Sequence, residues 1–541
     1  MFAGTKTLIG LILRRDRVKL PLWIIGITAS LIAMVPVLRD VYGDEASLTT
    51  LYQTFSLNPA GLFLTGPMDA PNFGALMTIE TILWWGLAIA FMNTLLVVRH
   101  TRQNEEIGAQ ELILSGQVHR GTSLIAVLII AFLANTLIAV GIGAGMAALE
   151  TSLWTTDQAW LYGLAMGLFG FAWAAIAAVI AQLVESARSA NGILAGLIGV
   201  AFLLRGIGDF MGTANADGIL QPTWLSWLSP FGWLQATRPL TFPEWWPLIV
   251  PSIFVVVAGS VAFFLLSKRD VGAGILPARK GHARASRFLG TPLGLTWHLQ
   301  KNIFIGWLIG VVAMVVTIGV LVPEMTHVYE SSENMKTLIA AMGGTGAIIP
   351  AFLSAMLSIV VLMVIAYTIQ GLGKLRGEES SGHLENLLAT QLSRMKWMGL
   401  HGIVVTIGGA FMLALSGGLL ALCVNLVSDY QLDIWEYTLA GLSYLPLLFV
   451  FAGMYIVLFG LLPRIAGLVL WVYYGFVAFM SWLGPLLKLD QQILDLSLLT
   501  HLAAAPGEEI VARPLIIFSI VAIGLLIIGT TAWRHRNLLE R

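Results

Sequence analysis

The sequence has few charged residues and a single cysteine, and each shortage excludes a class of protein. Charged residues make up 11% of the 541 residues and the mean hydropathy is +0.84, whereas a soluble globular protein has about 25% charged residues. We therefore expect an integral membrane protein. One cysteine, Cys423, allows neither a disulfide framework nor a cysteine-based metal site. The net charge of zero gives no argument for a nucleic-acid partner.

Motifs of nucleotide-binding and hydrolytic enzymes are also missing from the sequence. No G-x-x-x-x-G-K-[ST] or H-E-x-x-H pattern occurs, and the nine histidines are scattered without ligand spacing. We therefore expect no catalytic residue, metal site or cofactor in this chain. The N-terminus lacks a short apolar core followed by small residues for cleavage, so no cleaved signal peptide is expected.

Twelve apolar runs are long enough to cross a membrane, which takes about 20 residues in a helix. They are too long and too uniformly apolar for barrel strands, so we expect helices. The runs lie near 19–38, 74–98, 122–149, 158–182, 190–209, 245–267, 303–322, 347–371, 397–424, 437–462, 466–485 and 512–533. The predicted fold is an all-α membrane protein of two parallel-oriented six-helix repeats. Its expected parts are domain 1–267, a basic linker over 268–287, domain 288–541, and an interfacial helix before each repeat, over 2–18 and 286–301.

A polar segment occurs twice, once in each repeat. Residues 102–120 read RQNEEIGAQELILSGQVHR, and residues 376–394 read RGEESSGHLENLLATQLSR. Without a gap, the first copy shares seven residue types with the second: Arg102, Glu105, Gly108, Glu111, Leu114, Gln117 and Arg120 match Arg376, Glu379, Gly382, Glu385, Leu388, Gln391 and Arg394. A spacing of three drifts around a helix of 3.6 residues per turn. We therefore expect a break near Gly108 and Gly382, followed by a short helix.

The distribution of lysine and arginine predicts how the chain is oriented. Most of them lie on one side of the membrane if both termini are cytoplasmic, and the loops on the other side are acidic. Both repeated segments then lie in the cytoplasm and present two matched surfaces, which suit two copies of one partner. The alternative is that Arg102 with Glu105, and Arg376 with Glu379, form only surface pairs on a helix.

Charged and aromatic residues inside the expected spans are candidates for gating or substrate contact. Glu80 and Arg205 lie at similar depth, so we expect them to pair, with Asp209 close to Arg205. The pair would either lock the outer gate or recognise substrate, and Ser354 replaces Glu80 in the second half. Aromatic residues suit large, mostly apolar ligands, although packing or lipid contact explains many of them. The candidates are Trp84, Trp85, Tyr473 and Tyr474.

The sequence resembles bacterial ABC exporter permeases of the tetronasin and polyketide-antibiotic type over essentially its whole length. The likeness is carried by R-x-x-E-x-x-G-x-x-E in both halves, RDVGAGILPAR at 269–279, LRGIGD at 204–209 and LSPFGW at 228–233. It implies two fused transmembrane domains in a bacterial plasma membrane, served by two separate ATP-binding subunits that bind ATP and Mg. The implied ATPase-coupling residues are those of the repeat: Arg102, Glu105, Gly108, Glu111 and Arg120, with Arg376, Glu379, Gly382, Glu385 and Arg394.

The predicted function is therefore ATP-driven export of hydrophobic drugs or antibiotic-like natural products by alternating access, with the ATPase on another chain. One alternative is an ion-coupled secondary multidrug transporter, in which Glu80 would be the protonatable group. Another is an ABC-type translocase of lipids, or a peptide-sensing membrane protein, either of which would share the ATPase coupling.

Overall fold

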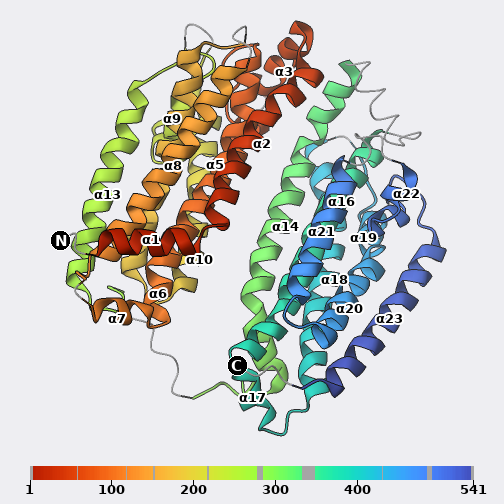
Figure 1. The fold of residues 1–541 in the computed structure, drawn as a ribbon. Helices are drawn as coiled ribbons and strands as arrows, with labels where there is room; N and C mark the ends of the chain where they lie inside the picture. Colours follow the sequence, from red (N-terminus) through yellow and green to blue (C-terminus); the bar gives the residue numbers. More distant parts are fainter. Residues whose placement is uncertain are drawn as a thin grey trace. The chain divides into compact units, whose positions relative to one another are not determined.

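The computed structural model describes residues 4–57, 59–116, 118–149, 153–215, 219–276, 284–331, 348–428, 430–483 and 490–537. The chain divides into two compact units, Met1–Gly281 and His282–Arg541. Each unit is built almost wholly of helices (Figure 1). The short strands β1 (Thr213–Ala214) and β2 (Leu220–Gln221) pair antiparallel in the first unit, with Thr213 opposite Gln221.

The first unit has six long helices that pass back and forth. They are α2 (Lys19–Tyr42), α5 (Phe73–His100), α8 (Thr122–Ala148), α9 (Thr156–Leu183), α10 (Ala187–Phe210) and α13 (Ile249–Lys268). Shorter helices connect them: α1 (Thr5–Arg15), α3 (Glu45–Leu57), α4 (Pro59–Leu64), α6 (Arg102–Glu106), α7 (Ala109–Leu114), α11 (Trp224–Trp227), α12 (Pro230–Ala236) and the 3-10 turn η1 (Trp246–Leu248).

The second unit repeats this plan. Its long helices are α14 (Pro292–Ser331), α16 (Ile348–Ser380), α18 (Arg394–Val427), the consecutive pair α19 (Ile434–Leu442) and α20 (Leu445–Leu461), α21 (Ala466–Leu483) and α23 (Ala512–His535). Its short elements are α17 (His383–Leu388), α22 (Gln491–Leu494) and the 3-10 turn η2 (Leu498–His501). We call the end of each unit that carries 102–120 or 376–394 its repeat end, and the other end its opposite end.

The described helices confirm the all-α membrane fold. In the described ranges, eleven helices are long and apolar enough to cross a membrane, and Ala466–Ser481 forms a shorter apolar helix. Together they coincide with the twelve spans that the sequence predicts. Within each unit, six spans bring the chain in and out at the repeat end; the shared orientation of the two repeats stays a prediction.

The two units differ at their first span. The first begins with α1, which buries Leu8 and Ile12 and carries Arg14 and Arg15 in its last turn, as expected for an interfacial helix. In the second unit, residues 292–301 are instead the first turns of the 40-residue α14. Residues 295–304, LTWHLQKNIF, contain no proline or glycine at which a helix would stop, so the expected interfacial helix and the span form one continuous helix.

Small residues let the spans pack closely. A Cβ atom on Gly163 of α9 would lie 2.3 Å from the carbonyl oxygen of Ala139 in α8, so the two backbones touch there. Asn93 of α5 and Asn135 of α8 donate amide hydrogen bonds to each other over 3.1 and 2.7 Å, and both are buried. Close backbone contact and side-chain hydrogen bonds are the forces that join helices inside a membrane.

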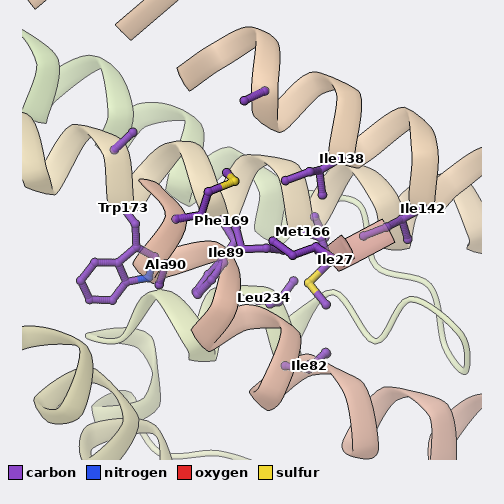
Figure 2. Packing of buried hydrophobic residues seen from close by; sticks show 14 of the residues in the cluster. Ile27, Ile82, Ile89, Ala90, Ile138, Ile142, Met166, Phe169, Trp173 and Leu234 are labelled. Carbon is purple, nitrogen blue, oxygen red and sulfur yellow. The ribbon is translucent and has the colours of Figure 1, made fainter. Parts of the chain in front are cut away.

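Figure 2 shows part of the apolar core of the first unit. Ile89 of α5, Ile138 of α8 and Phe169 of α9 belong to one buried cluster, and Leu234 of α12 belongs to it too. The neighbouring Phe231 of α12 is also buried, and its ring centroid lies 5.0 Å from that of Phe169. The segment between α10 and α13 therefore folds into the helix bundle, which anchors the opposite end of the unit.

Candidate functional site

Both repeated segments break at their central glycine, as the sequence predicts. Gly108 has φ +73° and Gly382 has φ +75°, in the left-handed region that favours glycine. The helix before each glycine ends within a few residues, and α7 or α17 begins directly after it. A left-handed glycine stops one helix and lets the next start in a new direction.

Glu105 lies at the centre of an ionic cluster at the repeat end of the first unit. Arg269 donates two hydrogen bonds to its carboxylate, Nη1 to Oε2 over 2.8 Å and Nη2 to Oε1 over 2.5 Å. Arg102 Nη1 donates to Oε2 over 3.0 Å, and the N–H of Gly272 donates over 3.3 Å. Both arginine side chains are buried and Glu105 is nearly so. Paired and hydrogen-bonded charges of this kind are the ones that proteins bury.

Arg102 also ties the repeated segment to two other parts of the first unit. Its Nε and Nη2 donate to the carbonyl of Ala181 near the end of α9, over 3.0 and 2.6 Å. Its Nη2 donates to the carbonyl of Ala273, over 3.2 Å. The N–H groups of Ile275 and Leu276 bond back to the end of α9. The start of the basic linker is therefore folded against the first unit and is not an open connector there.

The second unit builds two matching contacts from its own residues. Arg536 Nη2 donates to both oxygens of Glu379, over 2.8 and 2.7 Å. Arg394 donates to the carbonyl of Arg536 over 2.8 Å, just as Arg120 donates to the carbonyl of Arg269 over 2.6 Å. We call each set of three a clasp: Glu105, Arg120 and Arg269 in the first unit, and Glu379, Arg394 and Arg536 in the second.

Arg269 and Arg536 are functional candidates that sequence reasoning missed. Each follows the last long helix of its unit directly, since α13 ends at Lys268 and α23 ends at His535. From the sequence, both arginines add to the positive charge expected on the cytoplasmic side, and Arg269 opens the RDVGAGILPAR segment, but neither is predicted to pair with the repeated glutamates. Their matching place after the sixth span of each repeat is the signal that could have revealed them.

The clasps divide the repeated residues into a buried group and an exposed group. Arg102, Glu105 and Glu379 are buried or nearly so in ion pairs, whereas Glu111 and Glu385 are exposed. Arg376 lies part-buried near the end of α16. Beside Glu111, the side chain of Leu112 is 78% exposed, and the matching Asn386 of α17 is exposed as well. Only α7 and α17 offer the repeated carboxylates to a partner.

The predicted pairing of Glu80 with Arg205 is wrong. Arg205 instead pairs with Asp209 one turn along α10, with Nη1 3.3 Å from Oδ2, and both side chains are buried. Its Nη2 donates to the carbonyls of Phe63 and Leu64 at the end of α4, over 3.0 and 2.8 Å. Residues four apart share a helix face, so the nearer acid takes the arginine. Glu80 is part-buried on α5, and the described residues show no ion pair between it and Arg205.

Trp84 and Trp85 line a groove between α2 and α5. The groove has a volume of about 430 Å³, and its lining is mostly apolar: Leu22, Trp23, Gly26, Ile27, Ser30, Trp84, Trp85 and Ala88. Trp85 is held in place because its Nε1 donates to the carbonyl of Ile27 over 3.1 Å and lies 3.0 Å from Ser30 Oγ. Trp84 is 62% exposed. We call this the α2–α5 groove.

Tyr473 and Tyr474 lie on α21 of the second unit and are both part-buried. The hydroxyl of Tyr473 donates to the carbonyl of Leu496 over 3.1 Å, and its ring stacks on Phe451 with centroids 5.8 Å apart. The ring of Tyr474 meets Trp471 edge to face at 5.4 Å. Tyr473 is thus engaged within its own unit, and each tyrosine leaves only part of its ring for other contacts.

In the part of the chain that the structure describes, eleven long apolar helices and one shorter one, with ion pairs at one end of each unit, define a multi-pass membrane protein. The chain is 31% identical over 538 residues to the multidrug efflux system permease protein Rv1217c of Mycobacterium tuberculosis (strain ATCC 25618 / H37Rv), covering 99% of this chain and 95% of that protein. A family model described as multidrug efflux system permease Rv1217c, C-terminal domain, matches residues 289–534. The chain therefore belongs to the Rv1217c family of multidrug efflux system permeases.

This assignment confirms the broader part of the sequence resemblance, that of a permease. It makes the chain a transport subunit. The narrower likeness to tetronasin and polyketide-antibiotic exporters stays a prediction, as do the ATPase partner and the coupling roles of individual residues. Among the described residues, no group of three or more His, Cys, Asp or Glu side chains is placed to hold a metal ion.

Proposed function

We propose that this chain is the membrane-spanning subunit of an ATP-driven ABC exporter that extrudes hydrophobic drugs or antibiotic-like natural products. The observation that carries the proposal is the matched pair α7 and α17. Each starts after a left-handed glycine and presents an exposed glutamate in its first turn, Glu111 or Glu385. Two like acidic surfaces suit two copies of one ATPase, which would bind ATP and Mg on its own chain.

The clasps supply a route by which such a partner would move the membrane helices. In the first unit, Arg269 joins Glu105 to the end of α13, and Arg102 joins the same segment to the end of α9. Breaking a buried ion pair by removing one partner costs about 3–5 kcal/mol. A displacement of α7 would therefore be passed to the ends of α9 and α13 together. In this proposal, both termini and both repeat ends lie in the cytoplasm of a bacterial cell.

The α2–α5 groove supplies a candidate surface for the substrate. Its volume of about 430 Å³ lies within the range of roughly 300–1,000 Å³ that is usual for drug-sized ligands. Aromatic walls suit large apolar ligands, and Trp84 and Trp85 provide them. In alternating access, the two repeats would expose such a surface to each side of the membrane in turn. The buried Arg205–Asp209 pair fits a lock at the opposite end better than a site for substrate.

The test is to purify this chain with its bound proteins from native membranes and to count ATPase subunits. We expect two ATPase chains per permease, and their loss when Glu111→Ala is combined with Glu385→Ala. The matched control is Glu45→Ala with Glu509→Ala, which removes an exposed carboxylate from the opposite end of each unit. Retention of the ATPase by the control and by the first variant alike would contradict the coupling role of α7 and α17.

Transport assays separate the proposal from its alternatives. Export that stops on ATP depletion and continues when the proton gradient is removed supports an ABC exporter. The reverse result, with no ATPase partner, would favour an ion-coupled transporter built around Glu80. In inverted vesicles, accumulation of a labelled lipid and not of a labelled drug would assign the chain to lipid translocation.

A further inference from the structure

A second cavity lies at the opposite end of the first unit, away from the α2–α5 groove. It has a volume of about 430 Å³ and lies between the loop before α5, the β1–β2 hairpin, α11, α12 and the loop before α13. Every residue that lines it belongs to the first unit. We call it the hairpin cavity.

Asp69 lines the hairpin cavity with an incompletely paired carboxylate. Its side chain is 9% exposed, and Oδ2 faces Nε of Arg238 over 3.4 Å. Its other oxygen, Oδ1, is buried and accepts no hydrogen bond from the described residues. A buried carboxylate oxygen without a donor is costly and is seldom left so. The contrast with Glu105, whose two oxygens receive four donated hydrogen bonds, is clear.

Arg238 is shared with the hairpin and does not satisfy Asp69 alone. Its Nη2 donates to the carbonyl of Leu220 in β2 over 2.8 Å. Its backbone has φ +40°, a left-handed value that is strained for a residue with a side chain. The guanidinium thus divides its contacts between the carbonyl of Leu220 and Oδ2 of Asp69. A second N–H donor from outside the chain would complete the shell of Asp69.

The remaining walls of the hairpin cavity are aromatic and acidic. The rings of Trp227 and Trp246 stack with centroids 5.2 Å apart, and Trp246 is 54% exposed. Phe242 is also exposed, and Glu244 adds a second carboxylate. Among the described lining residues, Arg238 is the single basic one, so Asp69 and Glu244 give them one net negative charge. Aromatic faces and negative charge together attract cations.

We propose that the hairpin cavity is a binding site for an organic cation that carries an aromatic ring and an N–H donor. The N–H group donates to Asp69 Oδ1 after a rotation of the carboxylate, and the ring packs on Trp246 and Phe242. The cavity is large enough for a drug-sized molecule. The site belongs to the chain alone, so it does not depend on the proposed ATPase coupling.

The test uses ethidium, a fluorescent aromatic cation with amino groups, and the full-length chain in lipid nanodiscs without any ATPase. We expect saturable binding that Asp69→Asn weakens about tenfold, as for the loss of one charge-assisted hydrogen bond. Trp246→Ala weakens it as well, and Asp69→Glu restores part of the affinity. The control is Asp490→Asn, which removes an exposed carboxylate from the opposite end of the second unit. The anionic dye anilinonaphthalene sulfonate should not compete.

Two results would overturn the site. One is equal ethidium affinity in the wild-type chain and in Asp69→Asn, with the variant's thermal unfolding unchanged. The other is binding that Trp84→Ala abolishes and Asp69→Asn leaves intact, which would place the ligand in the α2–α5 groove. Should Asp69→Asn fail to fold, Trp246→Ala and Asp69→Glu carry the same test, because neither removes the charge at residue 69.

Discussion

Glu105 and Arg269 are joined at two points, over 2.8 and 2.5 Å, although 164 residues separate them in the chain. Glu379 and Arg536 repeat the relationship over 2.8 and 2.7 Å at a separation of 157 residues. In each unit the repeated segment at the end of the second span is therefore joined to the residue that follows the sixth span. Because the same contact forms at matching positions in both units, it is a feature of the repeated fold and not of one unit alone.

The first prediction concerns the strength of this clasp. Glu105→Gln and Arg269→Gln should each destabilise the chain by about 3 kcal/mol, because each leaves a buried charge without its partner. The double variant should lose less than the sum, since both changes remove the same interaction. Thermal unfolding of the four proteins in one detergent measures the difference. Simple additivity would show that the two residues are energetically independent. Glu111→Ala, at an exposed residue of the same segment, is the control that should leave the melting temperature unchanged.

The second prediction concerns the turn at Gly108. An added Cβ there meets no atom within 4 Å, so the cost of Gly108→Ala comes only from its φ of +73°. We expect a loss of about 1–2 kcal/mol and faster amide hydrogen exchange over residues 109–114. Gly108→Asn should cost less, because asparagine tolerates this conformation better than alanine does.

Gly116→Ala is the matched control for the turn. Gly116 has no positive φ, and its nearest atom to an added Cβ is the carbonyl oxygen of Ile113 at 3.5 Å, an ordinary contact. Its exchange over the same residues should stay at the wild-type rate. Equal exchange in Gly108→Ala and Gly116→Ala would argue against a strained backbone at Gly108.

The third prediction follows from the one clear difference between the two exposed helices. Leu112 is 78% exposed on α7, where α17 carries Asn386. If an ATPase covers both helices, Leu112 loses its exposed surface on binding, which stabilises the complex by about 1.5–3 kcal/mol. Leu112→Asn should therefore weaken ATPase binding by at least tenfold, while Asn386→Leu should not weaken it. Titration of purified ATPase subunit against each variant measures this, and an equal response to both changes would speak against a role for Leu112.

Most of the fold could be predicted from sequence, because a membrane leaves the backbone few choices. Twelve long apolar runs can only be helices there, and the breaks near Gly108 and Gly382 were indicated by a repeat whose spacing does not fit one helix face. The prediction of a separate interfacial helix before the second half was wrong. No stop signal separates residues 292–301 from the span that follows, and α14 is continuous.

The ion pairs were harder to predict, because they depend on which spans pack together. Arg205 and Glu80 were matched by depth alone, but Asp209 lies on the same helix face as Arg205 and takes its place. The partners of Glu105 and Glu379 come from the ends of the sixth spans, far along the sequence. Arg269 belongs to the RDVGAGILPAR segment, but that segment does not indicate which residue it pairs with. The matching place of Arg536 after the sixth span of the second unit is the signal for its role.

The last prediction is a pH dependence at Asp69 with two readouts of opposite sign. Burial raises the pKa of the Asp69 carboxyl from its ordinary value of 3.8 to about 6; the nearby charge of Arg238 partly opposes this and that of Asp209 adds to it. Further charged groups near Asp69 are Arg205, which is paired with Asp209, and Glu244 on the cavity wall. An organic cation prefers the ionised carboxylate, so ethidium affinity should be highest above pH 7 and should fall as the pH drops through 6.

Folding stability should change the other way. Because the folded pKa lies above the unfolded one, the folded chain binds this proton more tightly between about pH 4 and 6. The contribution of Asp69 to stability therefore rises as the pH falls through that window, by about 2–3 kcal/mol for two pKa units. An asparagine side chain at this position would not titrate in this range. In Asp69→Asn, the ethidium affinity and the melting temperature should therefore each lack the pH dependence that Asp69 gives the wild-type chain. Parallel pH profiles of the wild-type chain and Asp69→Asn, in either readout, would mean that Asp69 does not titrate near pH 6.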